Sequence, residues 1–186
     1  MFIEMHQIAI RRMKDNHDDF TLLFKWLTNS EVLTYYEGIN SNFTLEKIIQ
    51  KYQPRIRGEH YVTPCMIEYL NTPIGYLQYY QLQVTDIEHY EANKNGHEYG
   101  LDIFIGETKF WNKGLGTLAL KQLIHYLFTE KKATDIYIDP QIKNTRAIRS
   151  YEKCGFRKVK VLPKHELHNG EYEDCMIMRL TSKDFI

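Results

Sequence analysis

Cysteine is scarce in this chain of 186 residues, which contains Cys65, Cys154 and Cys175 and no CxxC pair. Three cysteines this far apart do not make the disulfide framework of a small secreted protein, and no signal-like apolar run follows Met1. We therefore expect a cytoplasmic protein without structural disulfides.

Long apolar runs, internal repeats and an excess of charge of one sign are also missing. No stretch approaches the roughly 20 apolar residues of a transmembrane helix, and Lys plus Arg and Asp plus Glu both total 24. Because the chain has no excess positive charge, we expect neither nucleic acid nor a membrane as a partner. The length suits one domain of about 150–200 residues. We expect a single domain over residues 1–186, as a monomer or a homodimer.

Hydrophobic periodicity predicts alternating strands and helices along the chain. Strands predominate early and a strand-helix-strand-helix-strand run follows, which predicts an α/β fold with a mixed sheet covered by helices on both faces. Pro64 favours an edge position for the start of its strand, and residues 83–97 read as a polar, acidic connection. The expected strands are 8–13, 62–70, 73–82, 98–106, 135–140, 156–162 and 173–180, and the expected helices are 18–29, 44–56, 115–128 and 145–154.

The stretch FWNKGLGT, residues 110–117, places two glycines where a strand leads into a helix. Such a turn aims free N–H groups at one point, and the helix dipole with Lys113 adds positive potential, so the turn suits a phosphate group. The spacing is neither GxGxxG nor GxxxxGKS, which indicates neither a dinucleotide fold nor a nucleoside triphosphatase. Taken alone, a tight turn without a ligand is an equal alternative.

A second motif, NTRAIRSYEKCGF, begins at Asn144, which can cap a helix that ends before Gly155. The two motifs together resemble the GNAT N-acetyltransferase superfamily. Its pyrophosphate loop is usually Q/R-x-x-G-x-G/A, although Trp111 stands here where Gln or Arg is common. Its later helix is usually N-x-x-A-x-x-x-Y-x-x-x-G-F, which this chain matches at Asn144, Ala147, Tyr151, Gly155 and Phe156.

This resemblance implies acetyl-CoA as the cofactor and a mostly antiparallel central sheet that is splayed in the middle. The pantetheine amides are expected to take the place of a missing strand against the main chain of residues 103–105. The implied cofactor-binding residues are Ile103, Phe104, Ile105, Lys113, Gly114, Leu115, Gly116, Thr117, Asn144, Ala147 and Tyr151.

Over nearly the whole chain, the order of segments also resembles aminoglycoside 6′-N-acetyltransferases. The segments that carry this likeness are LTYYEG, TPIGYLQYY, YGLDIFIGETKFWNKGLGT, IDPQIKNTRAIRSYEKCGF and PKHELHNGEYEDC. That family transfers acetyl from acetyl-CoA to an amine of a polycationic amino sugar, as in antibiotic resistance. A polyamine, a siderophore precursor or a protein N-terminus is an alternative acceptor. A non-catalytic module that binds acyl-CoA or an antibiotic is an alternative of another class.

Two residues are candidates for the proton transfers that acyl transfer to an amine requires. Asp102 shares a strand face with Gly100 and Phe104, and in the resembling family the aspartate of the Gly-x-Asp segment contacts the acceptor amine and is proposed as the base. Tyr151 lies on the inward face of its helix and by resemblance donates a proton to the departing thiolate. The alternatives are a solvated aspartate and an ordinary core tyrosine.

Recognition of a polycationic acceptor should be acidic. The stretch from Asp86 to Glu107 carries an excess of carboxylates, although a charge-rich loop is commonly only solvated. Aromatic rings can stack on sugar faces, and amides can hydrogen-bond hydroxyl groups, with ordinary packing as the alternative for each. The remaining candidate substrate-binding residues are Tyr36, Tyr52, Gln78, Asp139, Glu173 and Asp174, beside Asp102.

Other chemistry has little support in the sequence. His165 and His168 lie three residues apart in an expected loop and do not form the HExxH helix of a zinc protease, so we expect no metal. The cysteines fall in strands or beside a helix cap, which favours direct transfer in a ternary complex over an acetyl-cysteine intermediate.

Overall fold

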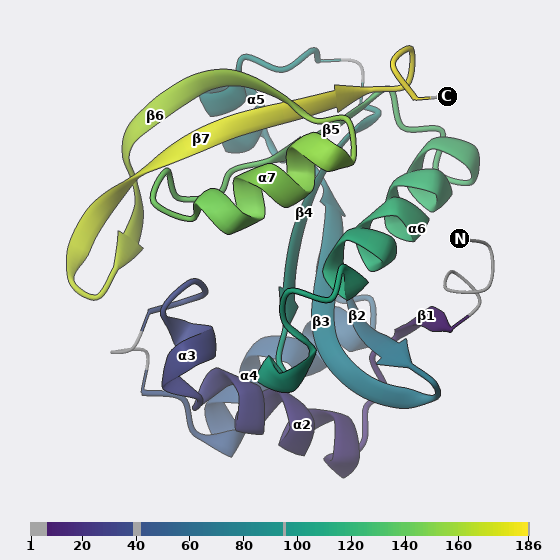
Figure 1. Ribbon diagram of the computed structural model, residues 1–186, viewed down its shortest axis with the longest axis vertical. Coiled ribbons are helices and arrows are strands. Elements are labelled where there is room, and N and C mark those ends of the chain that lie inside the picture. The colour runs from purple at the N-terminus through teal and green to yellow at the C-terminus, as the bar shows by residue number, and fades with distance from the viewer. Residues whose placement is uncertain (1–6, 39–41, 95, 186) are drawn as a thin grey trace. The chain divides into compact units, whose positions relative to one another are not determined.

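The structure is a computed structural model that describes residues 7–38, 42–94 and 96–185 (Figure 1). The chain divides into two compact units, and each is described by itself. The first unit comprises Met1–Gln78 with Ile103–Ala119, and the second comprises Tyr79–Asp102 with Leu120–Ile186. The expectation of one domain over residues 1–186 stays a prediction.

Seven strands form one mixed sheet in the order β1-β2-β3-β4-β5-β7-β6. β3 (Thr72–Gln81), β4 (Glu98–Ile105) and helix α6 (Leu115–Thr129) each run through both units. The pairs β1–β2, β5–β7 and β6–β7 are antiparallel, and β4–β5 is parallel. The predicted fold class, a mixed and mostly antiparallel sheet with helices, is confirmed.

In the first unit, which begins with β1 (Ile8–Arg12), helices α2 (His17–Leu27) and α4 (Leu45–Ile56) build a core against β2 (Val62–Tyr69) and β3 (Figure 1). α2 begins after Asn16, whose side chain accepts the Asp19 N–H, and carries its apolar residues on one face. α4 begins after Thr44, whose hydroxyl accepts the Lys47 N–H. The short helix α3 (Ser30–Leu33) was not predicted. The buried cluster contains Met13, Phe20, Leu23, Trp26, Leu27, Ile48, Tyr52, Met66 and Tyr76.

Pro64 does not mark a sheet edge, because β2 lies between β1 and β3. The last residue pair of β1 and β2 joins Arg12 to Cys65, and the Pro64 carbonyl accepts the Met13 N–H at 3.0 Å. The proline therefore lies just beyond the end of the β1–β2 ladder, where its missing N–H breaks no pair with β1.

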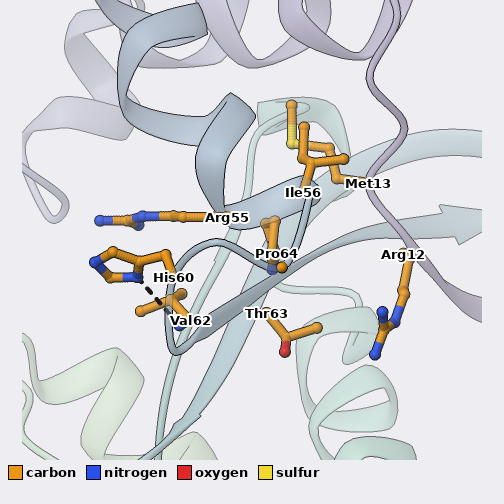
Figure 2. A pocket seen from close by; sticks show the side chains of 9 residues that line it. Arg12, Met13, Arg55, Ile56, His60, Val62, Thr63 and Pro64 are labelled. Carbon is orange, nitrogen blue, oxygen red and sulfur yellow. Dashed lines mark hydrogen bonds between the residues drawn. The ribbon is translucent and has the colours of Figure 1, made fainter.

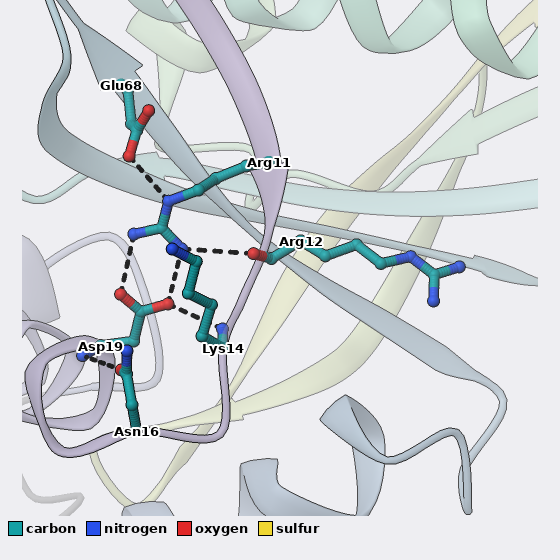
Figure 3. A network of polar contacts seen from close by, with 6 residues as sticks. All are labelled: Arg11, Arg12, Lys14, Asn16, Asp19 and Glu68. Carbon is teal, nitrogen blue, oxygen red and sulfur yellow. Dashed lines mark hydrogen bonds and ion pairs between the residues drawn. The ribbon is translucent and has the colours of Figure 1, made fainter.

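A buried carboxylate links β1 to α2 (Figure 3). Two nitrogens of the Arg11 guanidinium donate to the two oxygens of Asp19 at 2.6 and 2.8 Å, and the Lys14 N–H donates to the same carboxylate at 2.7 Å. Arg11 also donates to Glu68 of β2 at 2.7 Å. Burial alone would raise the pKa of Asp19, but these donors outweigh it and the pKa lies below its usual range.

We expect Asp19→Asn to lower the free energy of unfolding by about 1.5–3 kcal/mol at pH 7, because it removes the charge from buried hydrogen bonds with Arg11, which keeps Glu68 as its remaining acidic partner. Since the folded pKa of Asp19 is depressed, its stabilisation is present above its unfolded pKa of about 3.9 and is lost as the pH falls through the folded value. Urea unfolding at pH 7 and at pH 3 measures both effects. Asp15→Asn is the control, since Asp15 pairs with the exposed Arg57; equal losses in the two variants would contradict the prediction.

The second unit forms around β5 (Asp135–Ile138) and β7 (Glu171–Thr181). α5 (Val84–Tyr90) covers the sheet face that carries Tyr137 and Ile177. Leu180 lies on the opposite face. Gly155, just past the end of α7 (Thr145–Lys153), lies against it, since a Cβ at Gly155 would be 3.2 Å from the Leu180 side chain. Helical segments therefore cover both faces of this part of the sheet, as predicted.

Two segments of the second unit differ from the sequence-based expectation. Residues 83–97 contain α5, whose start is fixed by the Asp86 carboxylate accepting the Gln83 N–H at 2.9 Å. β6 (Arg157–His168) and β7 are longer than expected and meet in a turn at Asn169 and Gly170, both with positive φ (Figure 1). The segment around His165, expected to be a loop, is therefore strand. No helix among the described residues has both the length and the apolar character needed to cross a membrane.

Candidate functional site

In the first unit, the glycine turn lies between β4 and α6 and is tied to the end of β4. After the short helix η2 (Thr108–Phe110), the Trp111 indole donates from Nε1 to the Ile105 carbonyl at 2.7 Å. Trp111 takes the position where the family motif commonly has Gln or Arg. Its contact with Ile105 indicates that this residue fixes the turn instead of presenting a polar group to a ligand.

The turn itself has the properties of a phosphate cradle. Gly114 has a φ of +77°, which favours glycine, and a Cβ there would meet no atom within 4 Å. The first helical bond runs from the Leu118 N–H to the Gly114 carbonyl at 3.0 Å. Amides of the first turn of a helix have no acceptor within the helix. The open space and these amides fit the pyrophosphate of coenzyme A.

The remaining side chains of the turn have different surroundings. The Lys113 ammonium lies 5.5 Å from the centre of the Phe110 ring and is exposed, so it can add positive potential. Leu115 is buried, and Gly116 lies against Ile105, whose Cγ1 a Cβ would approach to 3.5 Å. The roles of residues 113–117 in cofactor binding stay predictions.

The end of β4 is held firmly within the first unit. The Gly106 and Glu107 N–H groups both donate to the Ile74 carbonyl, at 2.9 and 3.0 Å. A Cβ on Gly75 would lie 2.5 Å from the Phe104 carbonyl oxygen, so only glycine lets β3 approach the main chain of residues 103–105 this closely. This strand end, predicted to contact pantetheine, is thus fixed by main-chain contacts.

The three aromatic and amide candidates of the first unit fare differently. Tyr36 is half-buried with its ring 4.6 Å from that of Phe104, which is compatible with a ligand contact. Tyr52 is 0% exposed and packs against Tyr76 in the core, so the predicted stacking on a sugar face does not fit its position. Gln78 is buried, and its Oε1 accepts from the Tyr76 hydroxyl at 2.8 Å and from Arg55 at 2.9 Å, so its oxygen is engaged within the first unit.

In the second unit, Asp102 lies within β4 and Asp139 directly follows β5, and these two strands are paired and parallel. Gly100 of β4 pairs with Tyr137 of β5, and each aspartate lies two residues further along. Side chains alternate along a strand, so both aspartates belong to the strand face of the Gly100–Tyr137 pair. Asp102 is half-buried, and the side chain of Asp139 is 26% exposed. The second unit therefore gathers two carboxylates just beyond the last residue pair of β4 and β5.

Tyrosines surround these carboxylates. Burial raises the pKa of Tyr151, and the charges of Asp102 and Asp139 raise it further. The same causes, in the same order, raise the pKa of Tyr80, against whose ring Gly100 packs so closely that a Cβ would lie 2.5 Å away. A phenol with a raised pKa stays protonated at neutral pH, which is the form that a general acid needs.

The helix that carries Tyr151 begins as predicted. The Asn144 side chain accepts the Ala147 N–H at 3.2 Å, which confirms the helix cap, and Ala147 itself is half-buried. Tyr151 is buried with its ring 6.2 Å from that of Phe156. Its inward position is confirmed, and its catalytic role stays a prediction.

Most other acidic residues proposed for acceptor recognition already have partners. Glu173 pairs with Lys143 at 2.5 Å, and Asp174 accepts the Lys164 N–H at 2.9 Å. Four carboxylates of the 86–107 stretch are also engaged, which weakens the idea of a collective acidic wall. Asp86 caps α5, Glu91 pairs with Lys160, Glu98 accepts the Gly96 N–H, and Glu107 pairs with Lys25 and accepts from Trp26.

The first unit also contains a small pocket of about 110 Å³, and none of the candidate site residues lines it (Figure 2). Arg55 and His60 border it, and the His60 Nδ1 accepts the Val62 N–H at 3.2 Å. Burial and the nearby Arg55 lower the pKa of His60. Basic side chains do not attract a polycation, so this pocket does not suit the expected acceptor.

The cysteines are poor nucleophiles in this structure. Burial raises the pKa of Cys65 to about 12 and that of Cys154 to about 11, and it also raises the pKa of Cys175. Thiols in this state carry little thiolate at neutral pH. Among residues 7–38, 42–94 and 96–185, no cluster of three or more His, Cys, Asp or Glu side chains is arranged to hold a metal ion.

Comparison with known proteins decides the family. Residues 15–163 match the model of the acetyltransferase (GNAT) domain. The chain belongs to the GNAT acetyltransferase family. It is 30% identical over 151 residues to the aminoglycoside N(6′)-acetyltransferase type 1 of Klebsiella pneumoniae, covering 81% of this chain and 74% of that protein. Structures of this GNAT chain's relatives contain coenzyme A or acetyl-CoA, the cofactor that the resemblance implied.

Two further relatives bear on the acceptor. The structure of AAC(6′)-Ib in complex with ribostamycin and coenzyme A is similar to this GNAT protein with a TM-score of 0.81 and 27% identity, over 96% of both chains. The spermine/spermidine N(1)-acetyltransferase of Bacillus subtilis is 35% identical over 98 residues, which are 53% of this chain and 61% of that protein.

Sequence reasoning missed two residues beside Asp139. The Tyr90 hydroxyl donates to Asp139 Oδ2 at 3.0 Å, and His165 Nε2 lies 3.2 Å from the same oxygen. Tyr90 belongs to the helix that was read as a connection, and His165 belongs to the strand that was read as a loop. The Gln83–Asp86 cap was the available signal for the helix, but no local pattern placed His165 beside Asp139.

Proposed function

We propose that this GNAT protein is an acetyl-CoA-dependent aminoglycoside 6′-N-acetyltransferase that acts by direct transfer in a ternary complex. The observation that carries the proposal is the pair of half-buried carboxylates, Asp102 and Asp139, just beyond the last residue pair of the parallel strands β4 and β5 and beside protonated tyrosines. The relative from Klebsiella pneumoniae supports the acceptor class. Since the reaction consumes acetyl-CoA, we place the enzyme in the cytoplasm.

Acetyl-CoA supplies an acetyl thioester, whose carbonyl is the electrophile. The main chain of residues 103–105 and the glycine turn of residues 113–117 hold the cofactor, with Asn144 and Ala147 as further contacts. The N–H near Ile103 polarises the thioester carbonyl as a small oxyanion hole.

Asp102 binds the acceptor ammonium, orients it and takes its proton. A carboxylate beside a cation has a depressed pKa, so orientation and charge pairing contribute more than base strength. Tyr151 donates a proton to the departing thiolate sulfur, and its raised pKa keeps it protonated until then. Asp139 binds a second amine of the polycation, and Tyr36 contacts the sugar.

Release of free thiol from acetyl-CoA tests the proposal. We expect release on adding kanamycin or tobramycin, with the acetyl group mapped to the 6′-amine of the product by NMR. Because the relative from Bacillus subtilis acetylates spermine and spermidine by name, spermine is the comparison acceptor. A kcat/KM higher for spermine than for both antibiotics would replace the acceptor assignment. If the protein binds coenzyme A but releases no thiol with any amine, the non-catalytic binding module remains as the explanation.

A further inference from the structure

Residues of two different elements contact the same oxygen of the Asp139 carboxylate. Both the Tyr90 hydroxyl of α5, at 3.0 Å, and the His165 ring of β6, at 3.2 Å, contact the oxygen Oδ2. The side chain of His165 is 22% exposed, so the imidazole can exchange protons with solvent. Two donors on one oxygen fix the rotation of the carboxylate and direct its other oxygen away from them.

An irregularity in β6 places His165 beside Asp139. Between Leu162 and Glu166 the β6–β7 register shifts, and Lys164 has a φ of +50°, which is uncommon for a residue other than glycine. The Asp174 carboxylate of β7 accepts the Lys164 N–H at 2.9 Å and stabilises this irregularity. Bulges of this kind redirect a side chain, and here the redirected side chain is His165.

The charged surroundings of His165 favour its protonated form. Asp139 raises the pKa of His165 by hydrogen bonding, against the opposing effect of burial, and Glu166 and Asp86 raise it further. From α5, the His89 and Tyr90 rings also face it, with ring centres at 5.6 and 6.2 Å. His165 therefore changes charge at a higher pH than an ordinary imidazole.

We propose that His165 is a positioning residue for acceptor binding: when neutral it holds the Asp139 carboxylate for a substrate ammonium, and when protonated it neutralises that carboxylate and weakens binding. This inference rests on the proposed function, because it concerns the amine site of that reaction. It predicts that affinity for a polycation rises as the pH rises through the pKa of His165. The free energy of unfolding changes in the opposite direction. Because the pKa of His165 is raised in the folded protein, His165 stabilises the fold at low pH, and this stabilisation is lost as the pH rises through that pKa.

His165→Gln tests the proposal, because glutamine can donate the same hydrogen bond but cannot take up a proton. We expect the KM values of variant and wild type for kanamycin to agree within about twofold at pH 8, while at pH 6 the wild-type KM is roughly tenfold higher, about 1.4 kcal/mol. The KM for acetyl-CoA should not change. Comparing two proteins with one acceptor cancels the titration of the acceptor itself. A wild-type pH profile in the variant would overturn the proposal.

His125→Gln is the matched control, since His125 is exposed on α6 and contacts Phe185. It should keep the wild-type profile, and a profile like that of His165→Gln would overturn the assignment to His165. A second measurement needs no turnover: NMR titration should show a lower His165 pKa in Asp139→Asn than in wild type. An unchanged His165 pKa would overturn the contact, whereas a lowered pKa in a protein that acetylates no amine would reject the proposed function alone.

Discussion

Asp102→Asn should lower kcat for kanamycin by about 10²–10⁴-fold, the usual contribution of a positioned acid or base, while the Kd for coenzyme A stays the same. The variant keeps the shape of the side chain but removes its charge, so the acceptor ammonium loses both its partner and its proton acceptor. Asp102 is half-buried beside Tyr80 and Tyr151, whose pKa values its charge raises. Steady-state kinetics and calorimetric titration with coenzyme A measure the two quantities.

Asp184→Asn is the control for this experiment. Asp184 is an exposed aspartate of the second unit that pairs with Arg157 at 3.2 Å, so its loss removes the same charge away from the candidate site. The control should keep the wild-type kcat. If Asp102→Asn also kept it, Asp102 would be an ordinary solvated aspartate and the base would have to be sought elsewhere.

The sequence predicted those parts of the site that rest on local patterns. Asn144 caps its helix because the side-chain oxygen reaches an amide three residues later, a contact that depends only on local geometry. The inward position of Tyr151 follows from helical periodicity, and the face of Asp102 follows from strand alternation. Gly114 also has the positive φ that its place in the turn suggested.

The parts that failed depend on contacts between distant segments. Tyr52 follows a helical stripe that fits either a core or a binding surface, and only the packing of Tyr76 against it shows that it is core. Tyr90 and His165 reach Asp139 from 49 and 26 residues away in sequence. No glycine marks the β6 irregularity at Lys164 in the sequence, because the Asp174 carboxylate on β7 stabilises it instead. Such positions cannot be read from periodicity.

The glycine turn yields the second large effect, a loss of coenzyme A affinity in Gly114→Val. A valine at a φ of +77° strains the backbone, and its side chain would enter the open space at Gly114 where we place the pyrophosphate. Losing one hydrogen bond to a charged phosphate costs about 1.5–3 kcal/mol. We therefore expect the Kd for coenzyme A to rise by roughly tenfold to a hundredfold, measured by calorimetry.

Gly58→Val is the control that separates an effect on coenzyme A binding from the backbone strain of a valine at positive φ. Gly58 has a φ of +76° and also has no atom within 4 Å of a Cβ, but it borders the small basic pocket and not the turn before α6. Both variants should lose similar unfolding free energy, about 1–2 kcal/mol from the strained backbone. Only Gly114→Val should bind coenzyme A more weakly, because only its side chain fills the space assigned to phosphate. Equal affinities in the two variants would place the pyrophosphate elsewhere, and the main chain of residues 103–105 would then lose its assigned ligand as well.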